Sequence, residues 1–549
     1  MAAFAGESSI RGSSEAMRMV LLTFCTIGIT FTWGVEMTYC TPYLLSLGLS
    51  KSNTSMVWIA GPLSGLIVQP VIGVLSDENT SRWGRRRPMM VLGAVIVAAA
   101  MLVLGFTKEL VGLFVEDTDA ARMPTVLLAV LAIYVVDFAI NAVMSCSRSL
   151  IVDTLPIEKQ QSGAAWASRM SAIGNVIGYA GGAVDLVSIL GTTFGDTQFK
   201  LLTLIAVAAI LGTTAVTCWA VTEKVLLPDA AHQKNRTRHP SSSSSEGRFR
   251  VVAQILATIR HLPPRVRAIC WAQFWSWVGW FPFLFYSTTW VGETYFRYDA
   301  PASAGKDALG DIGRIGSRAF VLSSLITLTA SLVLPLVVRS PDEPTYTQRP
   351  HPVLTAALRV CGRWWSRPDL LTTWVAGHAL FAAAMTFAPF ATSYRFATAL
   401  VCLCAVPWAI AGWAPSALLG VEVNKLAGQG SGYHPLTRQD VEMTVLGEGS
   451  SSSGSPSQDA GGSSAELSGI YFGILNVYTT LPQFVGTFIS MIVFALLEPG
   501  KSRELGGEDG DKTPSATPTG PNAISVCLFI GAMSTIVSAF VTRRLRTLE

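Results

Sequence analysis

The chain has 549 residues, of which 50% are hydrophobic and only 14% are charged, and its mean hydropathy is +0.44. Soluble domains carry roughly twice this share of charged residues, so the composition excludes an ordinary soluble protein. The formal net charge of +4 is small, and we expect no nucleic-acid partner.

The hydrophobic residues lie in continuous blocks of about 18 residues or more, which is the pattern of transmembrane helices. Lipid does not hydrogen-bond an open backbone, so blocks this long and this apolar favour helices. We predict an all-α integral membrane protein with twelve transmembrane helices. The predicted spans are residues 18–47, 54–76, 88–107, 124–151, 163–190, 199–221, 267–291, 317–338, 369–391, 395–420, 467–497 and 521–542.

The loops set the orientation and the domain boundaries. Lys and Arg gather in the loops that follow even-numbered spans, and the positive-inside rule places those loops and both termini in the cytosol. Segments 421–466 and 498–520 are rich in Gly, Ser, Pro or charge, and we expect flexible loops there. The predicted parts are a cytosolic tail (1–17), a six-helix bundle (18–221), a cytosolic linker (222–266), a second six-helix bundle (267–542) and a cytosolic tail (543–549).

The fourth span carries the strongest polar pattern, with Asp137, Asn141 and Arg148 inside an apolar block. At about 100° per residue, Asp137 and Arg148 point roughly 20° apart and lie about 16 Å apart along the helix. A charge at this depth is costly unless it meets water or a partner. Removal from water favours the protonated form of a carboxyl group, which suits reversible proton uptake. A structural ion pair with another span is the alternative.

Two further side chains are candidates for a binding site. Glu36 lies within the first span and could bind protons, a polar ligand or an arginine. Trp275 belongs to a tryptophan-rich seventh span, and an aromatic face stacks well on the C–H face of a sugar ring. Tryptophan is also common in packing surfaces and at membrane interfaces, and this plainer interpretation is favoured for any single Trp.

The loop between the second and third spans reads GVLSDENTSRWGRRRP. It resembles the gating loop of the major facilitator superfamily, G-x-x-x-D-(R/K)-x-G-R-R, with about four residues inserted after Asp77. We expect a cytosolic latch in which Arg85 or Arg86 pairs with Asp153 at the end of the fourth span, while Asp77 faces a helix N-terminus. The alternative is a basic turn that only satisfies the positive-inside rule.

Several longer segments resemble the sucrose–proton symporters of the glycoside–pentoside–hexuronide group, in their fungal branch. These segments are TSRWGRRRP, TPYLLSLGL, WIAGPLSGLIVQPVIGVLSD, RSLIVDTLP, GNVIGYAGG, WFPFLFYSTTWVGE and GILNVYTTLPQ. The resemblance covers nearly all spans in order. It implies two six-helix bundles, proton symport of sucrose or maltose-like α-glucosides, proton coupling at Asp137 and sugar contact at Arg148. Lys51 stands where the plant members have a histidine.

Other functions remain alternatives. A monosaccharide–proton symporter is one, and a sugar sensor that barely transports is another. We find no nucleophile–base pair, metal cluster or phosphate loop with usable spacing, so we expect no enzyme, metal or cofactor. The expected partners are a disaccharide-sized sugar, protons and membrane lipid. The plasma membrane is the expected location, with the vacuolar membrane as the alternative.

Overall fold

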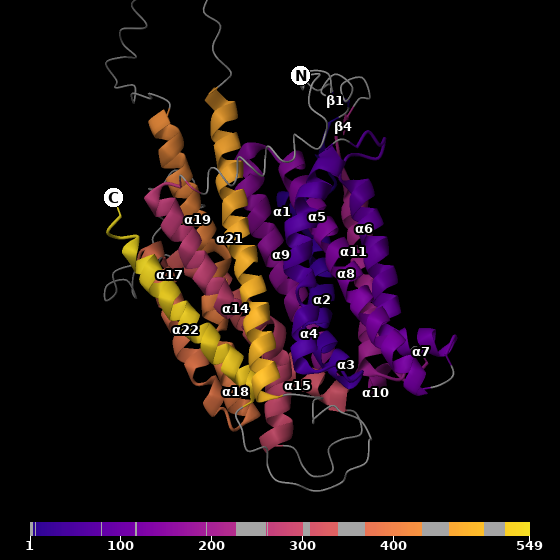
Figure 1. Ribbon diagram of the computed structural model, residues 1–549. Helices are drawn as coiled ribbons and strands as arrows, with labels where there is room; N and C mark the ends of the chain where they lie inside the picture. The colour runs from indigo at the N-terminus through magenta and orange to yellow at the C-terminus, as the bar shows by residue number, and fades with distance from the viewer. Residues whose placement is uncertain are drawn as a thin grey trace, which may run out of the picture.

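The structure is a computed structural model of the chain, drawn in Figure 1. It describes residues 4–5, 7–77, 79–115, 118–193, 195–226, 260, 262–299, 308–338, 368–430, 460–498 and 522–548. The described part is a bundle of long, roughly parallel and antiparallel helices, and the first and second halves of the chain lie side by side (Figure 1).

The first half forms six passages, with two short outer helices, α7 (Thr107–Gly112) and α10 (Leu186–Leu190). The passages are α1 (Glu15–Thr23) with α2 (Cys25–Val35), η1 (Glu36–Cys40) and α3 (Thr41–Ser46); α4 (Lys51–Val57) with α5 (Ala60–Asp77); α6 (Arg87–Gly105); α8 (Thr118–Thr154); α9 (Ile157–Ala183); and α11 (Gln198–Ala220).

The second half forms six more. These passages are α14 (Pro264–Tyr298); α15 (Ala308–Val337); α17 (Leu370–Thr386) with η2 (Ala388–Phe390); α18 (Tyr394–Leu403) with α19 (Ala405–Gly430); α21 (Ala460–Leu497); and α22 (Ala523–Arg544). We call the two halves the N-terminal and the C-terminal bundle.

The all-α fold with twelve membrane passages is confirmed. Ten of the passages are long and apolar enough to cross a membrane by length and composition. The other two, α9 and α14, have 27 and 35 residues and a less apolar sequence. Most of α14 is buried, so neighbouring helices rather than lipid surround its polar groups.

One of the predicted flexible regions, 421–466, is shorter than expected at both ends. Helix α19 continues to Gly430 and α21 already begins at Ala460, so 421–430 and 460–466 are helical. In the first of these segments, Glu422 pairs with Lys425 one turn later, at 3.2 Å, and with Arg265 of α14, at 3.3 Å. Such pairs extend a helix beyond its apolar part. Residues 431–459 and 499–521 lie outside the described residues, as does most of the predicted linker.

The start of that linker pairs with the N-terminal tail. Strand β1 (Phe4–Ala5) lies antiparallel to β4 (Val225–Leu226), and β2 (Ser9–Ile10) lies antiparallel to β3 (Val221–Thr222). The predicted boundary between bundle and linker therefore falls inside a pair of short strand contacts. These contacts hold the N-terminal tail at the end of α11.

Within each bundle, glycine lets helices approach closely. A Cβ added to Gly28 of α2 would lie 2.9 Å from the carbonyl oxygen of Ala209 in α11. A Cβ on Gly279 of α14 would lie 2.6 Å from the carbonyl oxygen of Gly531 in α22. Small residues at such crossings are how membrane helices gain packing contacts without a hydrophobic driving force.

The bundles meet mainly at one end. We call the end that carries Arg85 and Arg543 the cytosolic end, after the positive-inside rule, and the opposite end the outer end. At the outer end, Lys51 of α4 forms ion pairs with α14 and α21 residues, and Asp185 pairs with Arg314 of α15 at 3.1 Å. At the cytosolic end, the ion pairs of Arg85 and Arg86 stay within the N-terminal bundle. Among the described residues, the ion pairs that join the two bundles therefore lie at the outer end.

Candidate functional site

Asp137 lies on α8 and is 3% exposed. Its Oδ2 atom is buried and has no hydrogen-bond partner among the described residues. Gly61 of α5 leaves room beside it, because a Cβ at that position would lie 4.0 Å from Oδ2 and 3.8 Å from the ring of Phe285. Since Phe285 belongs to α14, the Asp137 carboxyl group lies at the contact between the two bundles. It is not locked in an ion pair within the described part.

Glu36 is fully buried, and neither of its carboxylate oxygens has a hydrogen-bond partner in the described part of the chain. It begins η1, a π-helical turn within the first passage. Pro42 follows this turn, lacks an N–H for the carbonyl of Thr38 and crowds that carbonyl, which favours a widened turn just before it. Thr288 of α14 donates a hydrogen bond to the Met37 carbonyl, at 3.2 Å, so η1 also borders the C-terminal bundle.

Glu36 and Asp137 are close enough for their charges to interact. Two carboxylates that share a buried site cannot both ionise without a large cost, so a proton on one of them stabilises the other. The structure thus brings together two acids that are 101 positions apart in the sequence, counting from 36 to 137. The sequence pattern placed each within a span but offered no reason to pair them.

Asn141 is held between α5 and α8. Its amide Nδ2 donates to Ser64 Oγ at 2.8 Å and to the Asp137 carbonyl at 2.9 Å, and its Oδ1 accepts from Gln69 Nε2 at 3.1 Å. Both the NH₂ group and the oxygen of the Asn141 amide therefore have hydrogen-bond partners within the protein. Ser64 and Gln69 were missed by the sequence analysis, because the sequence of one span does not show which residue of another span its polar side chains will contact.

Arg148 lies on the same face of α8 as Asp137 and Asn141, and its side chain is exposed. Val152, one turn further, is 54% exposed. Arg148 forms no ion pair with an acid in the described residues. Asp137 is too far away for one, because it lies about 16 Å from Arg148 along the helix. It is thus a cation with five N–H donors on an exposed side chain.

Trp275 lies on α14, in the C-terminal bundle. Its ring lies 5.7 Å from the ring of Phe274, edge to face, on α14. Trp280 of the same helix instead contacts Trp408 of α19 at 5.0 Å and Phe381 of α17 at 4.3 Å, between ring centroids. These contacts fit aromatic packing within the C-terminal bundle.

The basic loop joins three elements of the N-terminal bundle. Arg85 Nη2 and Arg86 Nε both contact Asp153 Oδ2 at the end of α8, at 3.1 and 2.9 Å. Arg86 also donates to Ser76 of α5. Asp77 ends helix α5, and its side chain lies outside the described residues.

Glu223, just after α11, completes this loop and was missed by the sequence analysis. Its carboxylate accepts hydrogen bonds from three successive backbone N–H groups, those of Arg85, Arg86 and Arg87, at 2.9, 2.9 and 2.8 Å. These are the free donors at the N-terminus of α6, where an anion is favoured. Gly84 makes the turn with φ +114°, and a Cβ there would lie 2.9 Å from the Glu223 carboxylate.

Within the described residues, no group of three His, Cys, Asp or Glu side chains is placed to hold a metal ion. The carboxyl groups of Asp137 and Glu36 can bind protons, and the amide of Asn141 and the guanidinium group of Arg148 can form hydrogen bonds. Both fit the recognition of a neutral, hydroxyl-rich molecule together with a proton.

Comparisons with known proteins point the same way. Residues 23–259 match the family described as MFS/sugar transport protein. The general alpha-glucoside permease of Schizosaccharomyces pombe is 29% identical, over 97% of this chain and 94% of its own length. Sucrose transport protein SUC4 of Arabidopsis thaliana is 29% identical, over 55% of this chain and 60% of its own length. These matches confirm the resemblance that the sequence motifs indicated.

Solved structures confirm the fold. A bacterial homolog of the human lysosomal transporter Spinster superposes with a TM-score of 0.54 at 12% identity and covers 98% of both chains. A D-xylose–proton symporter gives 0.53 at 12% identity and covers 95% of this chain and 96% of its own. The similar proteins are transporters and not enzymes.

Proposed function

We propose that this chain is a sugar–proton symporter of the major facilitator type. Its similarity to the MFS/sugar transport proteins and its multi-pass membrane fold support this proposal. The substrates are sucrose or maltose-like α-glucosides. The names of two relatives, an alpha-glucoside permease and a sucrose transport protein, support this substrate class. Transport proceeds by alternating access, in which the two six-helix bundles rock about a central site.

One observation carries the proposal: two buried carboxyl groups, Asp137 and Glu36, lie where the bundles meet. Asp137 Oδ2 and both Glu36 oxygens have no hydrogen-bond partner among the described residues. A buried carboxyl group is easily accommodated when protonated and costly when ionised. Its protonation state therefore affects which arrangement of the bundles is favoured. Asp137 takes a proton from the outer side and releases it to the cytosol, and this couples the sugar to the proton gradient.

The sugar is bound on the same face of α8. Arg148 presents several donors to the hydroxyl and ring oxygens of the sugar, and Glu36 accepts hydrogen bonds from its hydroxyl groups. Asn141 supports the site through its hydrogen bonds to Ser64 and Gln69, which set the position of α8 relative to α5. Trp275 stays a candidate stacking surface, although its ring contact with Phe274 favours a packing role.

The cytosolic loop acts as a latch on the N-terminal bundle. Arg85 and Arg86 hold Asp153, and Asp77 is the acidic position of the same sequence motif. The latch keeps α5, α6, α8 and α11 moving as one body, so that the bundles and not single helices change position. The parts of the chain that move are the two bundles at 18–221 and 267–542.

The driving force follows from the charge that accompanies the sugar. A membrane potential contributes about 2.3 kcal/mol per elementary charge per 100 mV. At about 1.4 kcal/mol per factor of ten, one proton per sugar supports accumulation of roughly fifty-fold at that potential. We place this activity in the plasma membrane, with lipid around the bundles and both termini in the cytosol.

Uptake of radiolabelled sucrose, maltose, trehalose and glucose into cells that express the chain tests this function. We expect accumulation of one or more α-glucosides that a protonophore abolishes, together with sugar-dependent alkalinisation of a weakly buffered medium. Uptake confined to glucose would contradict the substrate class. Accumulation that a protonophore leaves unchanged would contradict proton coupling.

A further inference from the structure

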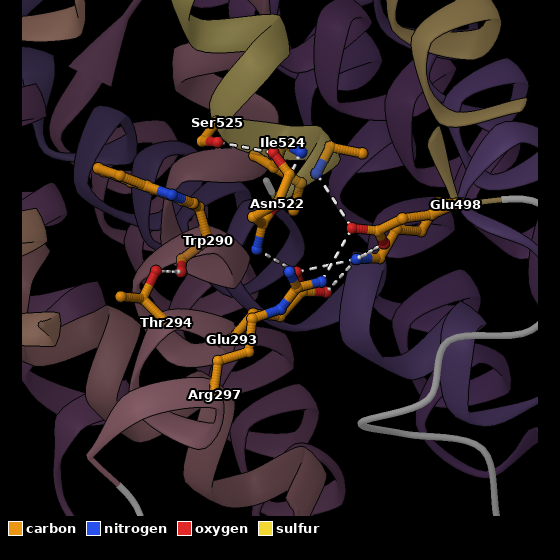
Figure 2. Close-up of polar contacts among 10 residues, drawn as sticks. Trp290, Glu293, Thr294, Arg297, Glu498, Asn522, Ile524 and Ser525 are labelled. Atoms are coloured by element: carbon orange, nitrogen blue, oxygen red, sulfur yellow. Dashed lines mark hydrogen bonds and ion pairs between the residues drawn. The ribbon is translucent and has the colours of Figure 1, made fainter. Parts of the chain in front are cut away.

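A group of buried charges spans the two bundles at the outer end (Figure 2). Lys51 of α4 is 3% exposed, and its ammonium contacts two carboxylates of the C-terminal bundle. The distances are 2.7 Å to Glu293 Oε1 of α14 and 2.5 Å to Glu498 Oε2 at the end of α21. Glu293 is fully buried, and Glu498 is 22% exposed. The sequence analysis noted Lys51 only as a departure from the plant pattern.

Each carboxylate also has partners within its own bundle. Asn522, the N-cap of α22, donates its Nδ2 to Glu293 Oε2 at 2.9 Å. Arg297 Nη2 and the Ala523 backbone N–H donate to Glu498 Oε1, at 2.8 and 3.0 Å. Figure 2 shows Glu293, Arg297, Glu498 and Asn522 converging from α14, α21 and α22.

The arrangement is therefore asymmetric. If the outer ends of the bundles separate, Glu293 keeps Asn522, and Glu498 keeps Arg297 and the N-terminal N–H of α22. These contacts lie within one bundle and move together. Lys51 leaves with the N-terminal bundle, and an ammonium that reaches water is readily solvated. A buried ion pair is costly to break when one charge is left buried without a partner. Here Glu498 keeps a cation, and Glu293 keeps a hydrogen-bond donor.

We propose that Lys51 is the releasable half of an outer gate, which holds the carrier inward-facing by binding Glu293 and Glu498 and opens when Lys51 withdraws into outer water. In the closed state, the two carboxylates balance the two cations, Lys51 and Arg297. This role rests on the alternating access of the proposed function, but it concerns the equilibrium between two conformations and not the identity of the substrate. The gate sets how often the sugar site faces outward.

A second contact between the bundles lies closer to the middle of the protein than this gate. Thr288, five residues before Glu293 on α14, is 1% exposed and donates to the Met37 carbonyl across the bundle contact. Five residues correspond to about 7 Å along a helix, so Thr288 lies inward of the gate. A cysteine at this position is buried when the outer end is closed and becomes accessible when it opens. It is a reporter of outward opening that needs no transported sugar.

The test is the rate at which the Thr288→Cys protein reacts with a membrane-impermeant maleimide added outside intact cells. The chain with Thr288 intact gives the background from native cysteines. Lys51→Met removes the charge and keeps most of the side-chain length. We expect it to raise the labelling rate of the introduced cysteine several-fold, and we expect Lys51→Arg to leave the rate near that of the parent.

Lys200→Met is the matched control, because Lys200 also contacts two carboxylates at the outer end, Glu109 and Asp196, but both belong to its own bundle. We expect no change in labelling from this variant. If Lys51→Met fails to reach the membrane, Glu293→Gln carries the test, with an expected increase of labelling. An unchanged rate in a well-expressed Lys51→Met or Glu293→Gln protein would overturn the gate, whatever sugar the protein transports.

Discussion

Two groups of acids at the contact between the bundles, one in the middle of the protein and one at its outer end, differ in their hydrogen-bond and ion-pair partners. Asp137 Oδ2 and both oxygens of Glu36 have no hydrogen-bond partner in the described part of the chain. Glu293 and Glu498 are bound to Lys51, Asn522, Arg297 and a helix N-terminus. The same residue types thus serve two purposes within one membrane protein.

Because their partners differ, the two groups respond differently to protons. An acid without partners in a buried site gains much from protonation, so it is suited to carry a proton between the two sides. An acid that is bound by cations and N–H groups resists protonation and holds two elements together. Within the middle group, Asp137 is therefore assigned to proton coupling and Glu36 to sugar binding, and the outer group is assigned to conformational control.

The largest expected effect comes from neutralising the middle group. Asp137→Asn keeps the size of the side chain and removes its titration. We expect accumulation of sugar against a gradient to be lost completely, while the thermal stability of the purified protein is unchanged or raised, because no ion pair is broken. Uptake of labelled sugar and fluorescence-detected unfolding measure the two effects. Asp196→Asn, on the outer loop, is the control that retains accumulation.

Glu36→Gln separates sugar binding from proton coupling. A hydrogen bond to a charged group contributes about 1.5–3 kcal/mol, so its loss should raise the half-saturating sugar concentration roughly ten-fold or more. Accumulation at saturating sugar should persist. Concentration-dependent uptake in the variant and the parent gives the measurement. A variant with unchanged half-saturation and no accumulation would instead place Glu36 with Asp137 in proton transfer.

Gly84→Ala probes Glu223, an acid outside both groups that is held by backbone N–H groups. A residue with a Cβ costs about 1–2 kcal/mol in the left-handed region, and here the Cβ also meets the Glu223 carboxylate. Gly191→Ala is the matched control, with φ +70° and no atom within 4 Å of the added Cβ. We expect a larger drop in melting temperature for Gly84→Ala than for Gly191→Ala. Equal drops would show that the carboxylate readjusts freely.

The smallest expected effect is that of mild acid on the outer gate. Burial raises the pKa of Glu498, but Lys51, the Ala523 N–H and Arg297 outweigh this and hold the pKa below its ordinary value. Glu293 and Asn522 complete the groups that face it. A lowered pKa in the closed state stabilises that state above the ordinary carboxyl pKa, and the stabilisation is lost as the pH falls through the lowered value.

The gate should therefore stay closed between about pH 7 and about pH 5 and loosen only in stronger acid. The labelling rate of Thr288→Cys, corrected for the pH dependence of the thiol reaction with a solvent-exposed cysteine, checks this. A corrected rate that rises several-fold between those two pH values would mean that the gate itself senses protons. The outer and middle groups would then not differ in the way described.

The sequence predicted what depends on a single helix. The apolar blocks indicated the twelve passages, and helical spacing placed Asp137, Asn141 and Arg148 on one face of α8. The sequence did not predict contacts between helices, such as Gln69 with Asn141 or Lys51 with Glu498, which are 72 and 447 positions apart. Such pairs depend on how helices are arranged in the bundle, and neither hydrophobicity nor periodicity contains that arrangement. The π-helical turn at Glu36 was likewise hidden, although Pro42 signals an irregularity there.

Purified protein in liposomes offers the most direct test of the central claim that Asp137 carries the coupled proton. Sugar-dependent proton influx, recorded with an entrapped pH dye, is compared with sugar counterflow in the same vesicles for the parent and for Asp137→Asn. We predict that the variant retains counterflow and loses the proton influx. Proton influx at the parent ratio to sugar in the Asp137→Asn protein would contradict the account.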